Sequence, residues 1–181
     1  MIVPEARLES TDRGLVPASD GWFVLNARDG RWRQWDGLGA RLSVEGDTDF
    51  PQVGINLYAL RPGEPTGMYH WEATQEDFLV LSGEALLIVE GEERPLRQWD
   101  FVHCPRLTKH IIVGAGDGPC AVLAVGAREH GPDEVWGGYS VDEVALRHGA
   151  SVDRETDDAD AAYAHLPARE WSAYRDGWLG G

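Results

Sequence analysis

The central part of the chain carries a pattern typical of β-strands. From residue 53 to residue 125, short apolar runs follow one another, and glycine, proline or charged residues interrupt them. The segment 53–60 alternates before a turn at residues 61–65, and Glu90-Gly91 closes a hairpin between two later runs. Further strands are expected at residues 68–72, 77–81, 85–89, 94–97, 101–104, 110–113 and 120–125. Many short strands with regular turns predict an all-β sandwich or barrel rather than a parallel α/β sheet.

The N-terminal residues lack this regularity. Residues 1–20 show no period and predict a loose arm, while residues 22–26 and 31–35 are candidate strands. On this basis we expect three parts, namely an N-terminal arm packing on the barrel (1–50), the barrel (51–128) and a C-terminal extension (129–181).

The C-terminal extension contains signals for short helices. Ser140 with Glu143 three residues later forms a capping-box pattern, and Gly149 is a natural stop, which predicts one helix between them. A second short helix is expected within residues 157–165. The aromatic segment 171–178 is expected to pack back on the barrel or on a partner chain.

Four side chains in the β-region are of the kinds that bind divalent metals. They are His70, Glu72, Glu76 and His110, and imidazole and carboxylate bind such ions without thiolate chemistry. Residues two apart on a strand point to the same face, so His70 and Glu72 project into one space. Glu76 opens the next apolar run, and His110 opens another. The pattern predicts a metal site assembled from neighbouring strands.

Charge and composition exclude some partners. The chain has 31 acidic and 16 basic side chains and a formal net charge of −15, so its surface repels phosphate backbones and anionic membranes. It contains no run of 18 apolar residues and no signal-peptide pattern, which predicts a cytoplasmic protein without a membrane or nucleic-acid partner. Cys104 and Cys120 stand in apolar surroundings and are expected to be buried free thiols.

The segment from Gly63 to Val113 resembles the two motifs of the cupin superfamily. The first motif has the form G-x5-H-x-H-x3,4-E-x6-G, and four residues match its positions: His70, Glu72, Glu76 and Gly83. Glu72 stands where the family usually has its second histidine. The second motif, G-x5-P-x-G-x2-H-x3-N, aligns on Pro105 and His110 only. The resemblance covers residues 50–128 and implies a small double-stranded β-helix barrel of the jelly-roll type.

In the cupin family these four positions bind a single divalent metal inside the barrel. By resemblance, His70, Glu76 and His110 would be ligands of an iron, manganese, zinc, nickel or copper ion. Glu72 leaves two options open. Either it is a fourth ligand, so that two carboxylates balance the +2 charge, or it turns away and leaves a two-histidine, one-carboxylate triad with open positions. A third option is a barrel that has lost its metal and kept a polar interior.

Other residues are candidates for the cavity wall. Phe78 and Val80 share strand parity with Glu76 and are expected to line a substrate cavity, and Tyr58 either lines it too or packs in the core. His103 has the intrinsic pKa of a general base, but a hydrogen-bonded core residue is the better interpretation. Cys104 has no activating cation nearby in sequence and is expected to serve packing.

These observations favour a metal-binding cupin that binds or converts a small organic molecule. The first hypothesis is a metal-dependent enzyme, oxygenase-like or isomerase-like, because cupins include such enzymes by resemblance. The second is a non-catalytic module that binds a small molecule or a metal, and the third is a metal-free structural cupin. A homodimer is expected as the assembly.

Overall fold

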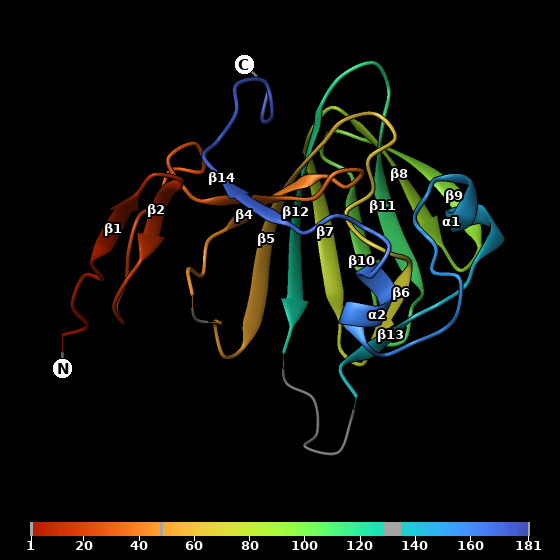
Figure 1. Ribbon diagram of the computed structural model, residues 1–181, viewed down its shortest axis with the longest axis horizontal. Coiled ribbons are helices and arrows are strands. Elements are labelled where there is room, and N and C mark those ends of the chain that lie inside the picture. The colour runs from red at the N-terminus through yellow and green to blue at the C-terminus, as the bar shows by residue number, and fades with distance from the viewer. Residues whose placement is uncertain (1, 48, 129–134, 181) are drawn as a thin grey trace.

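The computed structural model of the chain describes residues 2–47, 49–128 and 135–180, and two antiparallel sheets make up most of it (Figure 1). The larger sheet has, in spatial order, β10 (Phe101–Cys104), β7 (Glu76–Ser82), β12 (Cys120–Ala127), β5 (Val53–Leu60), β4 (Ala40–Ser43), β3 (Trp32–Gln34) and β14 (Glu170–Ser172). The smaller sheet has β13 (Gly137–Tyr139), β6 (His70–Glu72), β11 (His110–Ala115), β8 (Glu84–Val89) and β9 (Glu92–Arg97). The predicted all-β, double-stranded β-helix fold is confirmed.

The main core lies between the two sheets and follows from strand alternation. Along β7, Glu76 and the alternate residues Phe78 and Val80 are buried, which places Phe78 and Val80 on the inner face. The smaller sheet contributes Leu87 and Ile112 to the same cluster. Cys104 and Cys120 are both buried in this core as free thiols, as the sequence predicted.

The smaller sheet is also covered on its outer face. Ile88, Ile111 and Val113 point away from the main core and pack against Ala145 of the short helix α1 (Glu143–Arg147). This second layer explains why β8 and β11 read as continuous apolar runs rather than alternating ones.

The hairpin between β8 and β9 turns at the predicted dipeptide. Glu90 and Gly91 have φ angles of 49° and 76°, and two consecutive positive φ values are what a two-residue turn of the I′ type requires. The full pairing of β8 with β9, from Val89 opposite Glu92 to Glu84 opposite Arg97, starts from this turn.

The N-terminal region differs from the prediction. Residues 22–26 form no strand beyond one isolated bridge at Trp22, and Val24 is 80% exposed, because no neighbouring strand covers this apolar segment. A hairpin of β1 (Leu8–Thr11) and β2 (Gly14–Pro17) lies to one side of the molecule instead (Figure 1). The expected strand at 31–35 is present as β3, and it joins the larger sheet together with β4.

The C-terminal region contains the two expected helices. Asp142, rather than Ser140, caps α1, because its carboxylate accepts the Ala145 N–H at 2.8 Å. The second helix, α2 (Ala159–Tyr163), lies within the predicted segment. No described helix is long and apolar enough to cross a bilayer.

The aromatic end of the chain packs back on the body, as predicted. Strand β14 pairs with β3, and the Trp178 ring lies 5.0 Å from the ring of the fully buried Trp32. The predicted extension starts at residue 129, and its residues 129–134 lie outside the described part of the chain.

Candidate metal centre

Two histidines meet on neighbouring strands of the smaller sheet. His70 opens β6 and His110 opens β11, and the two residues are directly opposite each other in the antiparallel register. Residues in opposite positions of an antiparallel pair project from the same face, which brings the ring centroids within 4.8 Å. The strand pairing therefore gives the pair its position.

Backbone carbonyls orient both imidazole rings. His70 Nδ1 lies 2.8 Å from the Met68 carbonyl, and His110 Nδ1 lies 2.9 Å from the Thr108 carbonyl. A carbonyl can only accept, so each Nδ1 carries the hydrogen, and each Nε2 is directed into the site. A hydrogen bond of this kind on the far nitrogen is the usual support for a metal-binding histidine.

Glu76 reaches the histidines from the facing sheet. It opens β7, and its Oε2 lies 3.0 Å from His110 Nε2 and 3.7 Å from His70 Nε2. The three donor atoms all lie within 4.8 Å of one another, and this is the group in the described chain that has metal-site geometry. His110 and Glu76 are buried, and the His70 side chain is 18% exposed.

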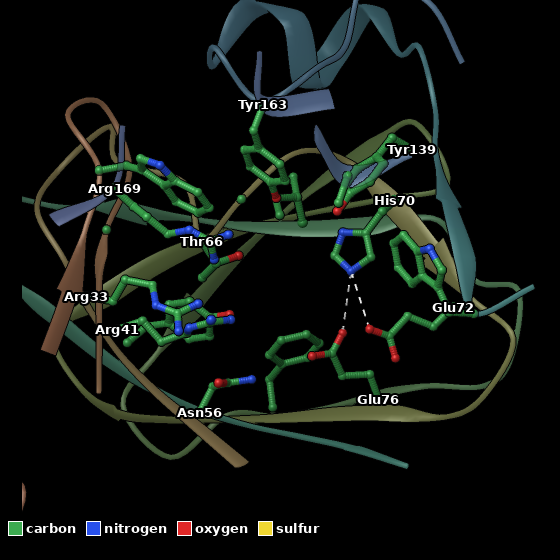
Figure 2. A pocket seen from close by; sticks show the side chains of 18 of the residues that line it. Arg33, Arg41, Asn56, Thr66, His70, Glu72, Glu76, Tyr139, Tyr163 and Arg169 are labelled. Atoms are coloured by element: carbon green, nitrogen blue, oxygen red, sulfur yellow. Dashed lines mark ion pairs between the residues drawn. The ribbon is translucent and has the colours of Figure 1, made fainter. Parts of the chain in front are cut away.

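Glu72 lies beside this group without being part of it. Its Oε1 is 3.9 Å from His70 Nε2, because residues two apart on β6 share a face (Figure 2). The structure thus brings three of the four predicted residues together and leaves the fourth carboxylate adjacent.

Burial and charge shift the protonation of the two carboxyl groups in opposite directions. Burial and the negative charge of Glu76 raise the pKa of Glu72 to about 7. Burial also acts on Glu76, but the hydrogen-bonding contact with His110 and the nearby imidazole of His70 outweigh it and lower the pKa of Glu76 to about 2. The pKa of His110 is raised because the hydrogen bond and charge of Glu76 outweigh the effect of burial. Without a cation, two carboxylates in this space repel each other.

The Glu72→Gln variant tests this repulsion. In metal-free protein the pKa of Glu72 is 4.5 when unfolded and about 7 when folded, so the folded state binds more protons between these values and loses stability as pH rises through them. We expect the Gln variant to gain on the order of 2–3 kcal/mol relative to wild type between pH 4.5 and pH 8. Urea unfolding of chelator-treated protein measures this difference, with the exposed Glu84→Gln as control. If the difference in unfolding free energy between the variant and wild type stayed constant with pH, the ionised Glu72 carboxylate would not destabilise the metal-free protein.

The donor set fits a divalent cation. Two atoms bonded to one ion at about 2.1 Å lie at most about 4.2 Å apart, and both contacts of Glu76 with the histidines satisfy this limit, while the donor atoms of the two histidines lie within 4.8 Å of each other. Two imidazoles with one carboxylate leave coordination positions open, which is the arrangement that suits Fe(II) and other first-row metals with exchangeable ligands.

The candidate centre lies at one end of a cavity of about 290 Å³. Tyr58 and Phe78, two of the residues proposed for a substrate cavity, line this cavity. Val80 does not. It is fully buried in the main core, because two residues further along β7 the facing side chains of the two sheets close the space.

Two reactive residue types near the site lie outside the cavity. His103 is exposed rather than buried as expected, and its Nδ1 lies 2.6 Å from Asp77 Oδ1. Cys104 is buried, and burial together with nearby carboxylates raises the pKa of its thiol to about 12, which fits a packing role.

Several cavity residues were missed by sequence reasoning. Their shared feature is that they come from segments outside the barrel motifs, and they are Arg33, Trp35, Arg41, Trp136, Tyr139, Tyr163 and Arg169. The alternation of Arg31 and Arg33 on a candidate strand was a signal for one of them. The remaining positions depend on how the two ends of the chain fold over the barrel.

The two facing antiparallel sheets, with histidines and carboxylates converging at one end of an internal cavity, define a double-stranded β-helix protein of the cupin class. Residues 56–126 match the family model of the cupin domain, so this part of the chain is a cupin domain. A comparison with curated protein sequences finds no significant match.

Solved structures share this fold over part of their length. A putative sugar phosphate isomerase from Acidithiobacillus ferrooxidans is 31% identical over 43% of this chain and 51% of its own, with a TM-score of 0.41. The chain thus spans about half of that protein. The polyketide cyclase RemF from Streptomyces resistomycificus is 16% identical over 61% and 82% of the two chains, with a TM-score of 0.51. A Klebsiella pneumoniae protein with a double-stranded β-helix domain is 20% identical over 51% and 78%, with a TM-score of 0.45. The likeness to RemF concerns the fold alone.

Proposed function

We propose that this protein is a metal-dependent cupin enzyme that acts on a small organic molecule. The observation that carries the proposal is the convergence of His70, Glu76 and His110, from three different strands, at the end of an internal cavity. Glu72 is the adjacent carboxylate that would add negative charge next to the ion, either as a fourth ligand or beside it.

A divalent ion at this position would polarise a carbonyl or hydroxyl oxygen of the substrate, or bind dioxygen if it is iron. The chain itself would hold the ion and orient the imidazoles through the Met68 and Thr108 carbonyls. The reaction is therefore proposed as isomerase-like or oxygenase-like, and the metal as one of iron, manganese, zinc, nickel or copper.

The cavity supports a small substrate. Its volume of about 290 Å³ is at the lower end of the range for small-molecule sites, and its middle is lined by aromatic side chains. Trp35 stacks on Tyr163 at 4.9 Å with the rings 7° from parallel, while Tyr139 meets the Tyr163 ring edge-on. This aromatic wall favours a ligand whose apolar central part carries a polar group at each end.

Turnover with defined metals tests the proposal. Chelator-treated protein is reloaded with each of the five ions and incubated with a panel of small hydroxy- and keto-acids, with and without O₂, and products are followed by NMR. We expect conversion of at least one compound that depends on the ion and disappears on chelation. Saturable binding of panel compounds by the loaded protein without any conversion would favour the non-catalytic binding module instead.

We also propose a homodimer. Strand β10 is an edge of the larger sheet, and Trp99 and Phe101 beside it are 67% and 64% exposed. Large apolar side chains on an unpaired edge favour association with a second copy. Light scattering at micromolar concentration checks this, and a mass of 20.0 kDa would contradict it.

A further inference from the structure

Two arginines lie directly opposite each other at the end of the cavity away from the metal centre. Arg33 of β3 pairs with Arg41 of β4 in the antiparallel register, and both side chains line the cavity. The same row continues with Tyr58 opposite Arg41 on β5 and with Trp171 opposite Arg33 on β14. Like charges in directly opposite positions destabilise a sheet, so this pair calls for an explanation.

The arginines of this group have no ion-pair partner among the described residues, and the negative charge of Glu45 acts on Arg41 only from a longer distance. Arg169 lines the same end of the cavity, and no described carboxylate forms an ion pair with Arg33, Arg41 or Arg169. Asp160 also lines the cavity, but none of the three guanidinium groups is within ion-pair distance of it. The charges stand out because the chain as a whole has a net charge of −15.

Aromatic rings hold the guanidinium groups in place. Arg33 lies over the Trp171 ring at 4.3 Å, Arg169 lies over the Trp35 ring at 5.1 Å, and Tyr58, opposite Arg41 in the register, raises the pKa of the Arg41 guanidinium. These contacts orient the guanidinium planes and do not neutralise the guanidinium charges. Arg33 Nε is buried and has no hydrogen-bond partner. Burial and the neighbouring arginines lower the pKa of Arg33 to about 10.

We propose that Arg33, Arg41 and Arg169 bind the oxyanion group, carboxylate or phosphate, of a small organic anion that occupies this cavity. Guanidinium groups bind such oxyanions through paired hydrogen bonds, and a bound anion would offset the repulsion between Arg33 and Arg41. The statement that this anion is the substrate rests on the proposed function. The statement that the three arginines bind it does not depend on that function.

The arrangement of the cavity also sets the shape of the ligand. Figure 2 shows the three arginines on the side of the cavity opposite His70, Glu72 and Glu76. The oxyanion end of the ligand would therefore lie away from the metal centre, its body along Trp35 and Tyr163, and a second polar group towards His70. The two carboxylates at the metal end would repel the anion and so favour one orientation.

Binding of simple oxyanions to metal-free protein tests this proposal. Chelator-treated protein is titrated with inorganic phosphate and, separately, with malonate at constant ionic strength, and heat and tryptophan fluorescence are recorded. We expect saturable binding of at least one, which sodium chloride does not reproduce; the anion that binds more tightly indicates the type of oxyanion. Arg33→Gln and Arg41→Gln are each expected to weaken binding at least 10-fold. The control Arg94→Gln, an exposed residue paired with Glu92, is expected to leave it unchanged.

Two further measurements separate binding from folding and from the metal. Ligand-free Arg33→Gln should melt at the same temperature as wild type or higher, because the repulsion is gone and the Tyr58 contact of Arg41 remains. A His110→Ala variant should still bind the oxyanion, so this proposal can stand if the metal proposal fails. No saturable binding of either anion, or binding that both arginine substitutions leave intact, would overturn it.

Discussion

Replacing His110 by alanine is expected to abolish stoichiometric binding of the divalent ion and all metal-dependent turnover. His110 is 1% exposed, and its Nε2 makes the shortest contact with Glu76 in the site. Loss of a supporting hydrogen bond alone costs a metal site about 10–100-fold in affinity, so loss of a direct ligand should cost more. Equilibrium dialysis against the metal, followed by elemental analysis, measures the change.

The matched control is His103→Ala. His103 also carries an imidazole in contact with a carboxylate, but it is exposed and lies outside the cavity. This variant should keep one ion per chain at wild-type affinity. If the His110 variant kept its ion equally well while remaining folded by circular dichroism, His110 would not be a ligand.

Removal of the ion is expected to lower the thermal stability of the wild-type protein. The site joins β6 and β11 of the smaller sheet to β7 of the larger one, so an ion held there links the two sheets. A ligand present at 100 to 1,000 times its dissociation constant stabilises the folded state by about 2.7–4.1 kcal/mol. For a chain of this size, this corresponds to a fall in Tm of roughly 5–15 °C on chelation.

Calorimetry with and without chelator measures this shift. His110→Ala serves as the control, because without the ion its melting temperature should not respond to the chelator. An equal Tm for chelated and metal-loaded wild type would argue against an ion that connects the sheets.

The barrel could be predicted from the sequence because its strands are determined locally. Alternation along residues 53–60 and the Glu90-Gly91 turn each specify structure within a few residues, and both are present in the fold. The segment 22–26 has the same apolar character without a neighbouring strand, and it forms none. Strand formation there depends on a partner, which local pattern does not reveal.

The candidate metal centre could be assembled from the sequence for a similar reason. His70 and Glu72 share a face by strand parity, and the motif spacing added Glu76 and His110. Strand parity predicts which face a side chain occupies but not how far along the strand the cavity extends. Val80 lies on the inner face as expected, but it is part of the main core.

The arginine end of the cavity could not be predicted in this way. Arg33 and Arg41 become neighbours through pairing of β3 with β4, and Arg169 joins them because the C-terminal segment returns to pair with β3. The pairing of β14 with β3 connects residues more than a hundred positions apart. Only the folded arrangement brings the three charges to one place.

The most direct test of this account is an anomalous difference map from crystals grown with Mn²⁺ or Zn²⁺, recorded on both sides of the metal absorption edge. We predict one strong peak per chain, about 2.1 Å from the Nε2 atoms of His70 and His110 and from a carboxylate oxygen of Glu76. A map in which neither metal gives a peak between these three residues would contradict the account.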